Sequence, residues 1–181
     1  MKLRQFLALA LAGVLMGILG ANLWKWQQQQ HPVAADSTGP DSQLPNFTLP
    51  SLDHSQWRAE EWRHKILVIN FWATWCPPCV REMPLLDRLQ KAFASQDVVF
   101  VGIAVDDADE VKKFVREKNI GFPILLGETR AMDLMVRLGN RFNALPYTVV
   151  ADHGGTIIMR KFGEVREEDL QPLLEKVTQG H

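Results

Sequence analysis

Cysteine is scarce in this chain of 181 residues, because Cys76 and Cys79 are the only two present. A structural zinc site usually needs four ligands, and no second C-x-x-C or H-x₃₋₅-H supplies the missing ones. One pair is also too few for an exported domain held together by disulfides. These absences favour a redox-active dithiol at Cys76-Pro77-Pro78-Cys79, with half of a metal site as the weaker alternative.

The chain also lacks a large excess of either positive or negative charge. The chain has 20 basic and 21 acidic residues, for a formal net charge of −1. A domain that binds nucleic acid usually carries a basic face, so this balance gives no indication of a nucleic-acid partner. No internal repeat is visible, and residues 44–181 have the length of one domain with an adequate core and no room for a second.

The N-terminal region has the pattern of a membrane anchor. Lys2 and Arg4 precede an uncharged run from Gln5 to Trp24, which is about long enough to span a bilayer as a helix. Because no good cleavage site follows this run closely, we expect residues 1–26 to form an uncleaved signal anchor; a cleaved signal peptide is the alternative. The positive flank then places the remainder on the exported side. Residues 27–43 are rich in polar residues and predict a flexible linker.

The dithiol lies where a buried strand is expected to lead into a helix. Residues 65–73 are an apolar, β-branched run, typical of a central strand. Pro77 and Pro78 suit a helix start, where a missing N–H costs little. Cys76 at the helix N-terminus would have its thiolate stabilised, and Cys79, one turn later, would be the more buried, resolving thiol. The helix itself is indicated by apolar residues at helical spacing: Met83, Leu85, Leu86, Leu89 and Phe93.

Downstream, strand and helix patterns alternate. The predicted elements are a strand at 98–105, a helix from the cap Asp107 to about 118, a strand at 122–126, a helix at 129–138, strands at 146–151 and 156–161, and a helix at 167–177. This order predicts an α/β fold, with a central mixed sheet flanked by helices on both faces.

Residues 71–79, Phe-Trp-Ala-Thr-Trp-Cys-Pro-Pro-Cys, resemble the active-site segment of the thioredoxin superfamily. They resemble most the membrane-anchored thiol–disulfide oxidoreductases related to TlpA and ResA. Pro84, Leu145-Pro146 and the opening segment 47–53 support this resemblance, which extends from about Leu44 to Val177. It implies a thioredoxin-like fold preceded by an N-terminal membrane-anchor helix.

The resemblance also implies roles for single residues. Cys76 and Cys79 would form a redox-active disulfide, and Pro146 would be a cis-proline that packs against it. Tyr147 either contributes to substrate selection or packs in the core, and the sequence does not decide between these. The residues expected to contact substrate are Trp75, Pro77, Pro78, Leu145, Pro146 and Tyr147.

Asn70 departs from thioredoxin itself, which has a buried aspartate at the matching position. An amide cannot exchange protons near neutral pH. Glu82 is one helical turn after Cys79, and ResA-like proteins have a glutamate at this position. The resemblance therefore implies that Glu82 is the catalytic acid–base group. An ordinary solvated glutamate on a helix face is the alternative.

The function implied is that of a single-pass protein of the bacterial inner membrane whose catalytic domain lies in the periplasm. It would reduce disulfides in exported proteins, such as apocytochrome c or copper-site cysteines. A membrane thiol donor of the CcdA or DsbD type would re-reduce Cys76 and Cys79. No cofactor and no bound metal are expected. Because the reduction potential decides the direction of electron flow, a thiol oxidant of the same fold stays open, as does a tethered Cu(I) metallochaperone.

Overall fold

The structure is a computed structural model that describes residues 42–179. The expected anchor at 1–26 and nearly all of the expected linker at 27–43 lie outside the described residues. Within residues 42–179, no helix combines the length and the apolar character needed to cross a bilayer.

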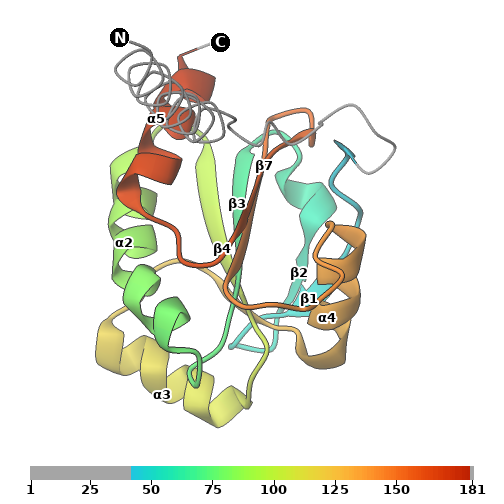
Figure 1. The fold of residues 1–181 in the computed structure, drawn as a ribbon, viewed down its shortest axis with the longest axis vertical. Helices are drawn as coiled ribbons and strands as arrows, with labels where there is room; N and C mark the ends of the chain where they lie inside the picture. The colour runs from blue at the N-terminus through green and yellow to red at the C-terminus, as the bar shows by residue number, and fades with distance from the viewer. Residues whose placement is uncertain (1–41, 180–181) are drawn as a thin grey trace, which may run out of the picture. The chain divides into compact units, whose positions relative to one another are not determined.

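A five-stranded sheet forms the centre of the domain, in the order β5-β4-β3-β6-β7 (Figure 1). Its strands are β3 (Ile66–Trp72), β4 (Val98–Ala104), β5 (Ile124–Leu126), β6 (Tyr147–Ala151) and β7 (Ile157–Phe162). Strands β3, β4 and β5 are parallel, whereas β6 runs antiparallel to β3, and β7 antiparallel to β6. The mixed sheet expected from the sequence is therefore confirmed.

Strand β3 is the central strand, and all seven of its residues are buried. This explains why its sequence is apolar at every position except Asn70, because a strand covered on both faces does not alternate. Near the carboxyl end of β3, Phe71 lies opposite Tyr147, which is the first residue of β6. The antiparallel pairing therefore brings the end of β3, which leads to the cysteines, to the same edge of the sheet as the segment that precedes β6.

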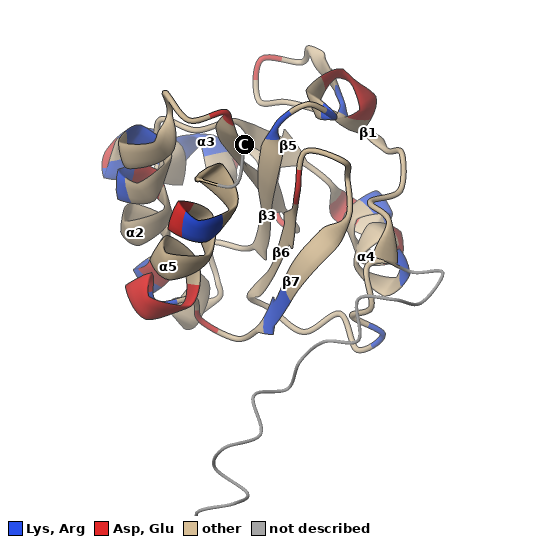
Figure 2. Cartoon of the chain, turned by 90° about the horizontal axis from the view of Figure 1, so that it is seen from above, with Lys and Arg blue, Asp and Glu red and all other residues tan. Residues whose placement is uncertain are grey.

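Four helices cover the two faces of the sheet: α2 (Pro77–Phe93), α3 (Ala108–Lys118), α4 (Glu128–Arg137) and α5 (Glu167–Thr178). Helices α2, α3 and α5 contribute to one buried cluster, and α4 contributes to a second cluster on the opposite face. Figure 2 shows α2 and α5 on one side of the strands and α4 on the other, with acidic and basic residues interspersed along the helices. The expected layered arrangement is confirmed.

The sequence patterns missed a short N-terminal hairpin. Strands β1 (Thr48–Pro50) and β2 (Gln56–Arg58) pair antiparallel and are followed by the 3₁₀ helix η2 (Ala59–Trp62). Each strand buries a single residue, Leu49 in β1 and Trp57 in β2. Three residues with one buried side chain are too few to show an alternating pattern, which is why the hairpin was not predicted.

A capping side chain fixes the start of α3, and two helices contain a proline. Asp107 caps α3, because its side chain accepts hydrogen bonds from the backbone N–H groups of Asp109 and Glu110. Helix α5 begins at Glu167, so Pro172 lies inside it and does not mark a later start. Pro84 likewise lies within α2.

Candidate active site

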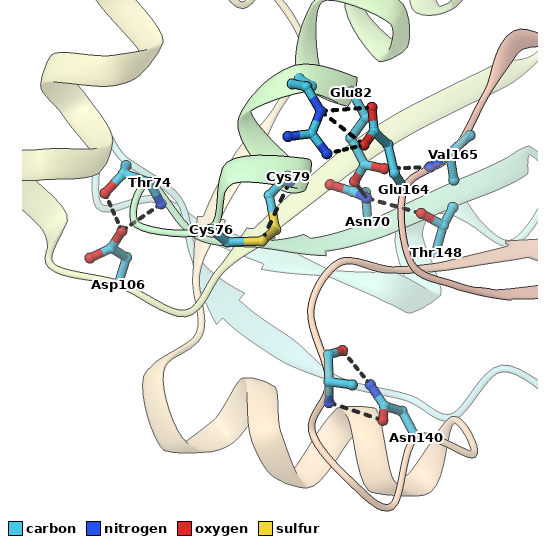
Figure 3. Close-up of a disulfide and its surroundings, with 12 residues drawn as sticks. Asn70, Thr74, Cys76, Cys79, Glu82, Asp106, Asn140, Thr148, Glu164 and Val165 are labelled. Atoms are coloured by element: carbon cyan, nitrogen blue, oxygen red, sulfur yellow. Dashed lines mark hydrogen bonds and ion pairs between the residues drawn. A yellow bond between two sulfur atoms is a disulfide. The ribbon is translucent and has the colours of Figure 1, made fainter.

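The two cysteines lie at the junction of β3 and α2 and form a disulfide with an S–S distance of 2.06 Å (Figure 3). Cys76 is the N-cap of α2: its backbone is extended, and its sulfur accepts a hydrogen bond of 3.4 Å from the Cys79 N–H. Pro77 and Pro78 occupy the first helical positions, where no intrahelical N–H is required. This is the strand-to-helix placement that the sequence predicts.

The two cysteine residues differ slightly in their exposure to solvent. Cys76 keeps 5% of its surface exposed, and Cys79 keeps none. Beside them, Trp75 is 65% exposed, Pro77 is exposed and Pro78 is half-buried. The free N–H groups of the α2 N-terminus and the helix dipole stabilise negative charge on a Cys76 thiolate once the disulfide is reduced.

The Leu145–Pro146 peptide bond is cis. Pro146 is buried and Leu145 is half-buried, and both directly precede β6 at the edge of the sheet from which the dithiol emerges. The loop before them is held by Asn140, which is fully buried: its Nδ2 donates to the Ala144 carbonyl at 2.8 Å, and its Oδ1 accepts from the Ala144 N–H at 3.2 Å. Sequence reasoning missed Asn140; its position directly after Gly139 was the available signal.

Tyr147 is a packing residue, which corrects its inclusion among the substrate contacts. It is fully buried, its ring packs against Phe71 and Phe162, and its hydroxyl donates to the Leu138 carbonyl at 2.6 Å. A side chain with no exposed surface offers nothing to a substrate. Tyr147 lies opposite Phe71, and both side chains belong to the buried cluster on the face of the sheet that α4 covers.

Glu82 is buried, with 1% of its surface exposed, which excludes the solvated alternative. Its Oε1 accepts a hydrogen bond of 2.7 Å from Asn70 Nδ2, and its Oε2 accepts one of 2.6 Å from the Val165 N–H. Burial raises the pKa of Glu82 to about 7, against the hydrogen bonds from Val165 and Asn70, which lower it, while the nearby charge of Glu164 raises it further. A carboxyl group with such a pKa exchanges its proton near neutral pH.

Asn70 links β3 to α2 and β6 through its side-chain hydrogen bonds. It lies in β3 and is 1% exposed; its Nδ2 donates to Glu82 on α2 and, at 2.9 Å, to Thr148 Oγ1 on β6. Its Oδ1 has no hydrogen-bond partner among the described residues. Thr148 was not singled out from the sequence, since a threonine within a strand carries no signal of its own.

Two further contacts hold the segments around the dithiol. The Thr74 N–H and hydroxyl both donate to Asp106 Oδ2, at 2.7 and 2.5 Å, which fixes the loop that leads to Cys76. Arg81 on α2 pairs with Glu164, its Nε lying 3.0 Å from Oε2, and this contact ties α2 to the loop that carries Val165. Asp106, which follows the end of β4 by two residues, is thus a positioning residue for this loop.

A dithiol at the N-terminus of a helix, beside a cis-proline and on a five-stranded mixed sheet, defines the class of thiol–disulfide oxidoreductases with the thioredoxin fold. The chain belongs to the AhpC/TSA family, whose sequence model matches residues 40–168.

Relatives and solved structures agree with this assignment. The thiol-disulfide oxidoreductase ResA of Geobacillus kaustophilus is 30% identical, over 98% of this chain and 99% of the relative. ResA of Bacillus thuringiensis is 28% identical, over 75% and 77%. A thiol:disulfide interchange protein of Chlorobium tepidum superposes with a TM-score of 0.69 at 25% identity, covering 76% of this chain and 96% of that one. The chain is therefore a thiol–disulfide oxidoreductase of the ResA type, with the Cys76–Cys79 disulfide in its active site.

Proposed function

We propose that this protein is a membrane-tethered reductant of disulfides in exported proteins, working in the bacterial periplasm. In the first step the Cys76 thiolate attacks a substrate disulfide, forms a mixed disulfide and releases one substrate thiolate, which takes up a proton. In the second step Cys79 attacks Cys76, which releases the second substrate thiolate. The substrate gains two electrons, and the protein ends as the Cys76–Cys79 disulfide.

The unequal exposure of the two cysteine residues is the observation that carries this proposal, because it supports Cys76 as the residue that meets the substrate. Only Cys76 has surface that a protein substrate can reach, whereas Cys79 is fully buried.

We propose that Trp75, Pro77 and Pro78 contact the substrate from the side of α2. Leu145 and Pro146 would contact it from the loop before β6, where the Leu145 backbone can pair with an extended substrate segment.

We propose that Glu82 is the acid–base group of the second step. Cys79 must lose its proton before it can attack, and Glu82 follows it by one turn of α2. With its pKa raised to about 7 by burial, the carboxylate of Glu82 is basic enough to take up that proton near neutral pH and to return it to solvent later. Glu82→Gln is expected to slow thiol–disulfide exchange by about 10²-fold.

The proposed location and partners follow from the resemblance to ResA-like proteins. Residues 1–26 would anchor the protein in the inner membrane, and residues 27–43 would link the anchor to the catalytic domain. Substrates would include apocytochrome c or copper-site cysteines, and a carrier of the CcdA or DsbD type would return electrons to the dithiol. A shared membrane raises the effective concentration of such partners.

The decisive experiment measures the reduction potential of the Cys76–Cys79 pair together with its redox state in cells. A reductant is expected to have a potential nearer that of thioredoxin, about −270 mV, than that of the oxidant DsbA, about −120 mV, and to be mainly reduced in cells. A pair that is oxidising and found oxidised in cells would identify a thiol oxidant instead.

A second assay separates exchange chemistry from metal delivery. The protein is expected to reduce insulin disulfides with or without copper, and Cys76→Ser is expected to abolish this activity, because the attacking sulfur is removed. Stoichiometric Cu(I) binding without reductase activity would favour a metallochaperone. The matched control is Cys79→Ser, which keeps the attacking sulfur but lacks the resolving one. It should trap the mixed disulfide that Cys76→Ser cannot form.

A further inference from the structure

Both hydrogen-bond partners of the Glu82 carboxyl group are donors. Asn70 Nδ2 donates to Oε1 and the Val165 N–H donates to Oε2. Two donors suit a carboxylate. A protonated carboxyl group carries an O–H of its own, which needs an acceptor when it is buried. If Glu82 gains and loses a proton, as the proposed function requires, the site must supply that acceptor.

The acceptor is present on the same amide. Asn70 Oδ1 is buried and has no partner among the described residues, although the Nδ2 of the same group makes two hydrogen bonds. Half a turn of the amide about its Cβ–Cγ bond would exchange Oδ1 and Nδ2. Oδ1 would then lie where Nδ2 lies now, 2.7 Å from Glu82 Oε1 and 2.9 Å from Thr148 Oγ1. Figure 3 shows the Asn70 amide between these two side chains.

We propose that Asn70 is a positioning residue whose amide turns with the protonation of Glu82, presenting Nδ2 to the carboxylate and Oδ1 to the acid. Thr148 reverses its hydroxyl in step, because a hydroxyl can accept from Nδ2 or donate to Oδ1. The proton resides on Oε1. Oε2 faces the backbone N–H of Val165, and a backbone donor cannot turn round.

The groups around Glu82 are compatible with both its protonated and its ionised form. Burial raises the pKa of Glu82 to about 7, so that both forms are populated near neutral pH. The charge of Glu164, from the loop before α5, raises it further; Arg81 on α2 pairs with Glu164, and β3 and β6 present only the uncharged Asn70 and Thr148. In either orientation one atom of the amide is unpaired, and the hydrogen bond to Glu82 is made only with the matching protonation state, so protonation of Glu82 favours one orientation over the other.

The test is an NMR titration of the full-length oxidised protein in micelles, where the disulfide prevents the cysteines from titrating. The side-chain amide protons of Asn70 are expected to show NOEs to Thr148 above the midpoint of the Glu82 carboxyl ¹³C titration and to lose them below it. Asn140 is the internal control in the same spectra, because Ala144 holds its amide on both sides. In Glu82→Gln the Asn70 amide should keep one orientation at every pH.

A second variant gives a readout that a merely structural role would not produce. Asn70→Leu removes a partner from both forms of Glu82, so its midpoint should move by less than about half a pH unit. A residue that only donates to the carboxylate would, when removed, raise the midpoint by about one to two units.

Two outcomes separate the failure of this proposal from that of the acid–base role. If Glu82 titrates near neutral pH while the NOEs of Asn70 stay unchanged, the turning amide is wrong and the role of Glu82 stands. If Glu82 keeps one protonation state from pH 5 to 9, the acid–base role fails, and the turning amide with it. Should Asn70→Leu not fold, the titration of the unaltered protein decides alone.

Discussion

At the scale of single residues, the burial of Glu82 has a cost that depends on pH. Its pKa is raised from 4.5 to about 7, mainly by burial. Below pH 4.5 the group is mainly protonated in both the folded and the unfolded state, so its ionisation makes no difference to stability. Between pH 4.5 and about 7 the unfolded state ionises while the folded state keeps its proton, so stability falls over this range, and above 7 the folded state holds a buried carboxylate.

Glu82→Gln should therefore stabilise the oxidised protein at pH 8 by up to roughly 3 kcal/mol, and change it little at pH 4. Urea unfolding at the two pH values measures this difference. Glu60→Gln, which alters an exposed glutamate of η2, is the control and should show no such contrast. An equal effect of Glu82→Gln at both pH values would contradict the raised pKa.

Tyr147 and Trp75 offer a contrast between packing and contact with substrate. Tyr147→Phe removes the buried hydrogen bond to the Leu138 carbonyl and should lower the free energy of unfolding by about 1 kcal/mol, with exchange rates unchanged. Trp75→Ala alters a residue that is 65% exposed, and should slow exchange several-fold while stability stays within about 0.5 kcal/mol. Urea unfolding and insulin reduction, measured on both variants, test the pair; a reversed pattern would restore Tyr147 as a substrate contact.

At the scale of elements, the start of α3 depends on one side chain. Asp107 accepts from the N–H groups of Asp109 and Glu110, so Asp107→Ala should cost about 1 kcal/mol of stability. Asp107→Asn keeps a capping oxygen and should cost much less. Thermal or urea unfolding of both variants compares them, and equal losses would show that the charge, and not the cap, matters.

At the scale of the whole molecule, the two buried clusters that hold the sheet between its helices are made of described residues. A protein that lacks residues 1–41 should therefore fold and keep its exchange activity, and, if residues 1–26 are the proposed anchor, it should not associate with membranes. Circular dichroism, insulin reduction and cell fractionation test these three results. Recovery of the natural protein from the soluble periplasm, with its N-terminus near Asp36, would show a cleaved signal peptide in place of the anchor.

The sequence by itself determined the dithiol, the buried strand before it, the helix that starts at Pro77 and the cap of α3. These features depend on residues close together in the chain, and spacing, proline positions and capping side chains express them directly. The short hairpin of β1 and β2 escaped because each strand buries one residue.

Only the tertiary structure decided the surroundings of the dithiol. The Val165 N–H that binds Glu82 comes from 83 residues further along the chain, and the Thr148 hydroxyl that binds Asn70 from 78 residues further. The burial that raises the pKa of Glu82 to about 7 results from packing α2 against the sheet and the loop before α5. Burial of a polar side chain depends on which distant segments cover it, and no local pattern in the sequence records that.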